Sequence, residues 1–447
     1  MEQKANLQIF MEYTILSVLG SLGVSCYILA DTFFISLGCG ANGLTALNLA
    51  VPLYNFIHGT GLMIGMGAAT KFSIVQSQRQ KKEGNAVYTH ALLLALVFSL
   101  FFMGIGIWAS YPLASWLGAD AQTLDMTNTY LYWLLLFAPA FILNDLFLCF
   151  VRNDGSPQLS MIAMVIGSLS NVVLDYVFIF PLDMGIFGAI LATGLSPLIS
   201  IGILSRHWLQ KKNTFHFERM PIRPALLKQT LVLGFPSLVT QLSGGIVMIV
   251  FNLLILGLAG NIGVAAYGIT ANIAFVVVAI FTGIAQGIQP LVSRFYGAGA
   301  LAESKKILKY ALVTTLGCSL VLYGVIAGFA PWITAVFNSE HHQSLQHISE
   351  AGLRIYFCSI PFAGVNIVLS LFFTSIEKTV PSYLLSLCRG LVLILPMAFL
   401  LARCLGMAGI WLTALVTEFL TALLAFFLYR QIKGKNERKK PYFCVKI

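Results

Sequence analysis

The chain has 447 residues, of which 58% are hydrophobic and only 10% are charged, and its mean hydropathy is +0.85. Soluble globular proteins carry about 25% charged residues, so this composition excludes an ordinary soluble domain and indicates an integral membrane protein. The net charge of +10 is explained by the positions of Lys and Arg along the chain, described below, and needs no nucleic-acid partner.

Apolar segments long enough to cross a bilayer recur along the whole chain. Several exceed the roughly 20 residues that one crossing needs, so we expect tilted or protruding helices. We predict an all-α polytopic membrane protein with twelve transmembrane helices in two pseudo-symmetric six-helix bundles. The predicted spans are residues 9–37, 43–76, 86–110, 125–149, 158–181, 184–208, 228–257, 263–295, 305–329, 350–376, 381–403 and 406–430.

Lys and Arg are concentrated in alternate connections. They follow the second, sixth, eighth and last spans, in the segments "KFSIVQSQRQKKEGN", "RHWLQKKNTFHFERMPIRPALLK", "RFYGAGALAESKK" and "KGKNERKK". The opposite connections carry acidic residues instead, with Arg354 and Arg403 as the main exceptions. These acidic residues are Asp120, Asp125, Asp183 and Glu340. The positive-inside rule therefore predicts that both termini face the cytoplasm.

The two halves of the chain resemble one another. Gly61 and Gly65 recur as Gly283 and Gly287, "GANGLTALNL" recurs as "GNIGVAAYGI", and "MGIFGAILAT" recurs as "LGMAGIWLTA", at offsets of about 220 residues. Two copies of an even number of helices share one topology, so a cavity between two lobes and alternating access are expected. The predicted division is an N-terminal lobe over 1–209, a cytoplasmic linker over 210–227, a C-terminal lobe over 228–432 and a basic cytoplasmic tail over 433–447.

Two polar residues stand out in the segment "SNVVLDYVFIF". Asn171 and Asp175 are four residues apart, and this spacing places them on one face of a helix. Ionisable residues inside a membrane span usually face a cavity and mark an ion or proton path. A purely structural hydrogen-bonded pair is the alternative interpretation.

Longer motifs resemble the multidrug and toxic compound extrusion (MATE) family. In the first half these are "DTFFISLG", "LTALNLAVP", "RNDGSP", "GSLSNVVLDYVFI" and "GIFGAILAT", and in the second half "GFPSL", "GIAQGIQPLVSRFYGAG" and "LGMAGIWLTAL". The resemblance covers nearly the whole chain in the family's order. It implies two six-helix lobes around a V-shaped cavity and export driven by a proton or sodium gradient.

The resemblance also implies an ion-coupling site. The chain is similar to the branch with an acidic network in the N-terminal lobe (DinF-like), because the tenth span lacks an acidic residue after Glu350 and Gln241 stands in the seventh. The implied coupling residues are Asp31, Asn171, Asp175, Thr193 and Tyr130. Sodium, if it is the coupling ion, is expected at Asp31, Asn171, Asp175 and Thr193.

The depth of these residues provides an independent check. Counted from the outer ends of their spans, Asp31, Asp175 and Thr193 all lie about 9–14 Å below the membrane surface, at 1.5 Å per residue. Tyr130 is slightly higher. Two close carboxylates repel, so one is expected to hold a proton near neutral pH. The same oxygen-rich cluster could instead coordinate a sodium ion, and the sequence leaves both coupling ions open.

Other ionisable residues lie within predicted spans. Arg389 and Glu418 occupy adjacent antiparallel spans, so we expect an ion pair in the C-terminal lobe. Asp145, seven residues before Arg152, is interpreted as an interfacial anchor or helix cap. His58 is interpreted as one partner of a hydrogen bond between helices, with a proton relay as the alternative.

The favoured function is secondary active export of organic cations or amphipathic drugs, an antiport coupled to inward proton or sodium movement. A lipid-linked oligosaccharide or polysaccharide flippase of the same wider superfamily is the alternative. Arg389 is the only clearly mid-span arginine, which disfavours the cationic cavity of such flippases. An intramembrane enzyme is disfavoured because no H-E-x-x-H motif occurs. We expect a monomer in the cell membrane, in contact with lipid and a small-molecule substrate, without cofactor or nucleic acid.

Overall fold

The computed structural model describes residues 2–338 and 342–438, and every regular element within them is helical. The predicted all-α fold is therefore confirmed. Glu340 and residues 439–447 of the predicted basic tail lie outside the described residues. The first half contains α1 (Glu2–Ser77), α2 (Lys81–Trp116), α3 (Leu124–Leu136), α4 (Ala138–Asn153), α5 (Pro157–Ile179), α6 (Gly185–Leu204) and the short α7 (Arg206–Leu209).

The second half has the same order of long helices. It contains α8 (Pro224–Gly297), α9 (Leu301–Gly328), α10 (Ala330–Phe337), α11 (Gln343–Tyr356), η1 (Phe357–Ser359), α12 (Ile360–Ser375), α13 (Thr379–Leu387), η2 (Cys388–Val392), α14 (Ile394–Leu405) and α15 (Met407–Arg438). Several spans are thus made of two helices in succession. One of them, α3 followed by α4, bends by 46° at Phe137.

The helices α1 and α8 each contain two membrane spans. Each is more than 70 residues long, whereas a bilayer core is crossed by about 20 residues. Each has one residue with non-helical backbone angles, Gly40 in α1 and Gly260 in α8. The chain folds back at Gly40. This reversal brings the hydroxyl oxygens of Tyr27 and Tyr54, on either side of the glycine, to within 2.7 Å of each other. With both helices counted as two spans, the described residues form the twelve predicted spans.

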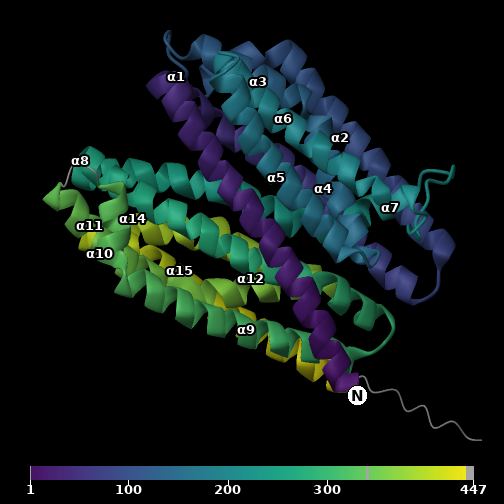
Figure 1. Ribbon diagram of the computed structural model, residues 1–447. Helices are drawn as coiled ribbons and strands as arrows, with labels where there is room; N and C mark the ends of the chain where they lie inside the picture. The colour runs from purple at the N-terminus through teal and green to yellow at the C-terminus, as the bar shows by residue number, and fades with distance from the viewer. Residues whose placement is uncertain (1, 339–341, 439–447) are drawn as a thin grey trace, which may run out of the picture.

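The helices gather into two bundles, one formed mainly by α2–α7 and the other by α8–α15 (Figure 1). The first leg of α1 runs along both bundles, and its N-terminal end lies beside α9. Phe10 and Tyr13 in this end belong to the buried apolar core of the second bundle, together with residues such as Phe281 and Phe357. The core of the first bundle contains Phe102 and Phe150 among others.

Large apolar side chains cover the outside of both bundles. Leu100 and Trp108 of α2 are exposed, as are Val313 and Leu320 of α9. In water such surfaces would be unfavourable, whereas in a bilayer they contact lipid. With nine helices or more that are long and apolar enough to cross a membrane, the chain is a multi-pass membrane protein.

Candidate functional site

The five residues predicted to couple ion movement come together inside the first bundle. Asp31 lies on the first leg of α1, Tyr130 on α3, Asn171 and Asp175 on α5, and Thr193 on α6. All five side chains are buried, and Asn171 and Asp175 are fully buried. The Asn171 amide Nδ2 donates to Thr193 Oγ1 over 3.4 Å. The carboxyl groups of Asp31 and Asp175 are close enough to interact with each other, as are Tyr130 and Thr193.

Several oxygen atoms of this acidic cluster lack partners. Asp31 Oδ1, both carboxyl oxygens of Asp175 and the Asn171 carbonyl oxygen are buried and accept no hydrogen bond from an N–H or hydroxyl donor among the described residues. An unsatisfied buried polar atom is costly, so such a group of acceptors points to something that binds there. Carboxylates can take up protons, and carboxylate, amide and hydroxyl oxygens are the ligand types that hard cations prefer.

Small residues allow the helices of the cluster to approach each other. A Cβ atom added to Gly194 would lie 2.2 Å from the Phe137 ring, at the bend between α3 and α4. This contact brings Thr193, the preceding residue, towards Tyr130 on α3. Similarly, a Cβ on Gly38 would lie 2.1 Å from the side chain of Ile179, so α1 packs closely on the end of α5 that carries Asp175. Glycine at these positions therefore makes the convergence possible.

A cavity of about 240 Å³ lies beside the acidic cluster and between the two bundles. Thr193 and Tyr27 line it on the cluster's side, and Gln241 and Gln286 of α8 line it on the other. Tyr27 is hydrogen-bonded to Tyr54, whose ring packs edge-on against Phe141 with centroids 5.7 Å apart. The cavity thus combines aromatic walls with polar groups, as small-molecule sites usually do.

Asp145 also lines this cavity, so its interpretation as an interfacial anchor or cap is wrong. It is buried in α4, eight residues before the helix ends at Asn153, which corresponds to about 12 Å along the axis. Its Oδ2 lies 2.8 Å from His58 Nδ1 in the second leg of α1. A Cβ added to Gly61 would lie 2.5 Å from the same oxygen. The glycine therefore provides the space that the carboxylate occupies.

In the second bundle, Arg389 and Glu418 are paired. Arg389 Nε and Nη2 both donate to Glu418 Oε1, over 3.2 and 2.9 Å. Sequence reasoning missed a third member, Asn366 of α12, whose Nδ2 donates to Glu418 Oε2 over 2.7 Å and to the Glu418 carbonyl oxygen over 2.8 Å. Arg389 lies in η2, which is a turn of π-helix. Such turns occur frequently at functional sites.

The two bundles contact each other at the end where the basic connections lie, which we call the basic side. There the Arg294 guanidinium donates to the carbonyl oxygen of Asn153, and Gln78, in the turn after α1, donates to the carbonyl oxygen of Gly297. These contacts hold the bundles together on this side. Further polar contacts between the bundles are Arg152 Nη1 to Gln286 Oε1 at 2.8 Å, Asn153 Nδ2 to Gln289 Oε1 at 2.9 Å, and Lys71 Nζ to Glu377 Oε1 at 3.0 Å.

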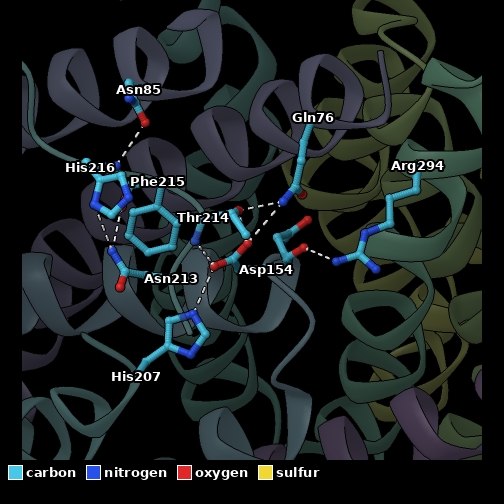
Figure 2. A network of polar contacts seen from close by, with 10 residues as sticks. Gln76, Asn85, Asp154, His207, Asn213, Thr214, Phe215, His216 and Arg294 are labelled. Carbon is cyan, nitrogen blue, oxygen red and sulfur yellow. Dashed lines mark hydrogen bonds and ion pairs between the residues drawn. The ribbon is translucent and has the colours of Figure 1, made fainter. Parts of the chain in front are cut away.

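A network around Asp154 fixes the segment after α7 to the first bundle (Figure 2). The carboxylate accepts hydrogen bonds from Gln76 Nε2 at 3.1 Å, from the backbone N–H of Thr214 at 2.8 Å and from the Thr214 hydroxyl. His207 Nε2 lies 2.9 Å from its second oxygen. Next to this network Phe215 is fully buried, stacked against His207. The connection between the bundles is therefore a folded part of the first one.

Comparisons with known proteins agree with this architecture. The MatE family model matches residues 17–177 and 236–400. The multidrug export protein MepA of Staphylococcus saprophyticus is 24% identical over 427 residues, which cover 95% of this chain and 94% of that protein. MepA of Staphylococcus aureus is 23% identical over 444 residues, 97% of this chain and 96% of that protein.

Solved structures share the fold. A MATE transporter crystallised with MaL6 superimposes with a TM-score of 0.91 at 24% identity, over 97% of this chain and 98% of that one. A MATE family transporter in an outward-facing conformation gives a TM-score of 0.89 at 24% identity, over 96% of both chains. A transporter of the MOP superfamily from Pyrococcus furiosus gives 0.88 at 24% identity, over 95% of both chains.

Proposed function

The chain belongs to the MATE family, whose model matches most of its length, and from this premise we propose that it is a secondary active multidrug exporter. It moves organic cations or amphipathic drugs out of the cell in exchange for protons or sodium ions that move inward. Its relatives of similar length are multidrug export proteins, which supports the substrate class. Its architecture supports transport rather than enzymatic chemistry.

One observation carries the coupling part of the proposal. Four buried oxygen atoms of Asp31, Asn171 and Asp175 accept no hydrogen bond from an N–H or hydroxyl donor among the described residues, and Thr193 connects this cluster to the cavity wall. Proton or sodium binding at these oxygens would neutralise buried negative charge. A change of charge beside the cavity alters the affinity for a cationic substrate, and this difference in affinity is what couples two fluxes.

We place the sides of the membrane from the distribution of charge. Basic connections and both termini are assigned to the cytoplasm of the cell membrane, so the contacts on the basic side form a cytoplasmic closure and the cavity faces outward. In this proposal the acidic cluster is a DinF-like network in a lobe over 1–209. The linker over 210–227, with the network around Asp154, joins it to a lobe over 228–432.

Alternating access then requires the interbundle contacts to break. The contacts of Arg294 with Asn153 and of Lys71 with Glu377 open when the cavity turns to the cytoplasm. Binding of the coupling ion to the acidic cluster disfavours the substrate in the outward state and releases it. The ion then leaves towards the cytoplasm.

Transport in proteoliposomes tests this function. Purified wild-type protein is reconstituted, a pH gradient or a sodium gradient is imposed separately, and movement of the organic cation ethidium is followed by fluorescence. We expect one of the gradients to drive ethidium movement, and thereby to identify the coupling ion. Asp175→Asn and Asp31→Asn should abolish gradient-driven movement while ethidium still binds to the detergent-solubilised protein.

Asp125→Asn provides the matched control, because Asp125 is an exposed carboxylate in the first turn of α3. This variant should transport like the wild type. The proposal fails if the double variant Asp31→Asn/Asp175→Asn keeps the wild-type response to both gradients, or if the wild type equilibrates ethidium without any gradient dependence, as a channel would.

A further inference from the structure

We propose that Arg389 is an anion-binding residue of the central cavity, which takes the carboxylate of zwitterionic amphiphiles whose cationic group lies near Asp145. This inference rests on the proposed export function and specifies one substrate class for it. The evidence is the geometry of the arginine, the way its partner is held, and the lining residues that the chamber beside Arg389 shares with the chamber beside Asp145.

Arg389 faces the space between the bundles. It lines a chamber of about 150 Å³ together with Gln241 and Gln286, and its side chain is 15% exposed. The next residue, Gly390, packs against α8 so closely that an added Cβ would lie 2.3 Å from Ser243 Oγ. The π-helical turn η2 thus presses against α8 while its arginine borders the chamber.

One edge of the Arg389 guanidinium is available to a second hydrogen-bond acceptor. A guanidinium has five N–H groups and can bind carboxylates in two-pronged fashion along its edges. Arg389 uses the edge formed by Nε and Nη2 for Glu418. Its Nη1 makes no hydrogen bond to any residue within the described part of the chain. The edge formed by Nη1 and the remaining N–H of Nη2 is therefore left to bind an incoming carboxylate.

Glu418 is held away from that edge. Asn366 Nδ2 donates to its Oε2 over 2.7 Å and to its backbone carbonyl over 2.8 Å. Both carboxylate oxygens of Glu418 therefore have donors: Oε1 accepts from Arg389 and Oε2 from Asn366. Glu418 thus orients the arginine through its Nε and Nη2 atoms alone. Buried ion pairs often stabilise a fold less than apolar residues of the same volume do. A contribution to stability therefore does not by itself explain an ion pair at this position beside a cavity.

The other end of the cavity suits a cation. Asp145 and His58 line the larger chamber, with Tyr54 and Phe141 beside them. Aromatic faces and a carboxylate attract organic cations. Arg152 also borders this chamber, but it is buried and its Nη1 is hydrogen-bonded to Gln286.

The two chambers lie next to each other. They share Leu62, Gln241, Val278, Thr282 and Gln286 as lining residues. An elongated amphiphile therefore meets acidic and aromatic groups in the first bundle and Arg389 in the second. The sequence of charges along the cavity matches a molecule with a cationic group at one end and a carboxylate at the other.

A pair of dyes tests the assignment: a xanthylium dye with a free carboxylate and the methyl ester of the same dye. The free acid is a zwitterion and the ester is a cation, but the aromatic body is the same. Equilibrium binding of both dyes to detergent-solubilised protein and their export from proteoliposomes are measured for the wild type, Arg389→Lys and the double variant Arg389→Gln/Glu418→Gln. The double variant removes both charges, so that no unpaired Glu418 is left in the membrane.

We expect the double variant to bind and export the ester like the wild type, and to lose about tenfold or more of its affinity for the free acid. Arg389→Lys, which keeps the charge without the planar edge, should lie in between. Equal losses for both dyes would show a structural role and overturn the assignment, as would unchanged binding of the free acid. Failure of the export function is a different result, because the wild type would then bind both dyes but export neither, and the ratio of the two affinities would still test Arg389.

Discussion

Gly260 repeats the backbone conformation of Gly40, which lies 220 residues earlier in the chain. Gly40 has φ 64° and ψ −161°, and Gly260 has φ 60° and ψ −156°. Each glycine joins the two legs of the first long helix of its bundle. A side chain at this combination of angles is strongly disfavoured, so glycine is required by the turn itself.

Replacement of this glycine should therefore destabilise the protein through its backbone. No atom lies within 4 Å of a Cβ added to Gly260, so the expected loss, about 1–3 kcal/mol for Gly260→Ala, comes from the conformation alone. Thermal unfolding of the detergent-solubilised protein measures it. Gly268→Ala is the control: this glycine is helical and equally open, and alanine there should leave stability unchanged or raise it slightly. Equal melting temperatures for the two variants would contradict the prediction.

The sequence predicted the number of spans and the repeat because both depend on patterns that lipid and backbone impose locally. A stretch of apolar residues must be a helix in a bilayer, and a turn with positive φ must have glycine. The ends of helices were predicted less well. For example, α2 begins at Lys81 rather than at residue 86, because a helix continues into polar residues beyond the lipid. The bend at Phe137 and the π-helical turn at Arg389 depend on packing, which hydropathy does not describe.

For the candidate site, the sequence predicted how deep the side chains lie in the membrane but not how the helices are rotated relative to one another. The depths of Asp31, Asp175 and Thr193 follow from counting residues, and the structure brings these side chains together. The pairing of Asp145 with His58 depends on how the second leg of α1 is rotated relative to α4, which counting does not give. Gly61 was noted only as part of the repeat, although its contact with Asp145 is the local signal for that rotation.

Gly61→Ala should disrupt the pair of Asp145 and His58. The added Cβ would lie 2.5 Å from Asp145 Oδ2 and 3.0 Å from Asp145 Cβ, so the carboxylate must move away from His58 Nδ1. We expect a loss of about 1–3 kcal/mol of stability. A double-mutant cycle with Asp145→Ala, measured by thermal unfolding, identifies the cause, because the 2.5 Å clash with the carboxylate is removed and only the 3.0 Å contact with the Cβ of residue 145 remains. Gly202→Ala, with open space around its Cβ, is the control. Strictly additive effects in the cycle are the result that speaks against this contact.

Asp154→Asn should release the segment after α7 from the first bundle. An amide can accept at only one of its two ends, whereas Asp154 accepts at both oxygens, from Thr214, Gln76 and His207. We expect a loss of about 2–4 kcal/mol in the stability of this docked segment. Limited trypsin digestion measures it as faster cleavage after Lys211 and Lys212.

Glu218→Gln is the control for this change, since it converts an acid to an amide in the same segment. Glu218 Oε2 accepts from Asn85 over 3.3 Å at an exposed position, and an amide oxygen can replace it. Cleavage of this variant should proceed as in the wild type. If Asp154→Asn is cleaved as slowly as the wild type, the prediction is wrong. The burial of Phe215 would then be sufficient to hold the segment in place without the carboxylate.

Gly234→Ala should separate the two bundles on the basic side. A Cβ on Gly234 would lie 1.7 Å from the carbonyl oxygen of Met63, and a Cβ on Gly67 would lie 2.1 Å from that of Thr230. These neighbours are backbone atoms, so no rotamer change relieves the clash and the helices α1 and α8 must move apart. The conformation that is closed on the basic side then loses stability relative to one that is open there.

Labelling of a cysteine at position 293 detects this shift. Ser293 is fully buried and accepts a hydrogen bond over 3.4 Å from Gln289 Nε2, which also donates across the bundles to Thr70 Oγ1 of α1 over 3.0 Å. In a background without the native cysteines, Ser293→Cys should react with a membrane-impermeant maleimide several-fold faster when Gly234→Ala is present. Gly244→Ala lies in the same helix with open space around its Cβ, and should leave the rate unchanged. If Gly234→Ala also leaves the rate unchanged, the contact of α1 with α8 at this point does not hold the basic side closed. Local distortion of the two helices would then relieve the clash without moving the bundles apart.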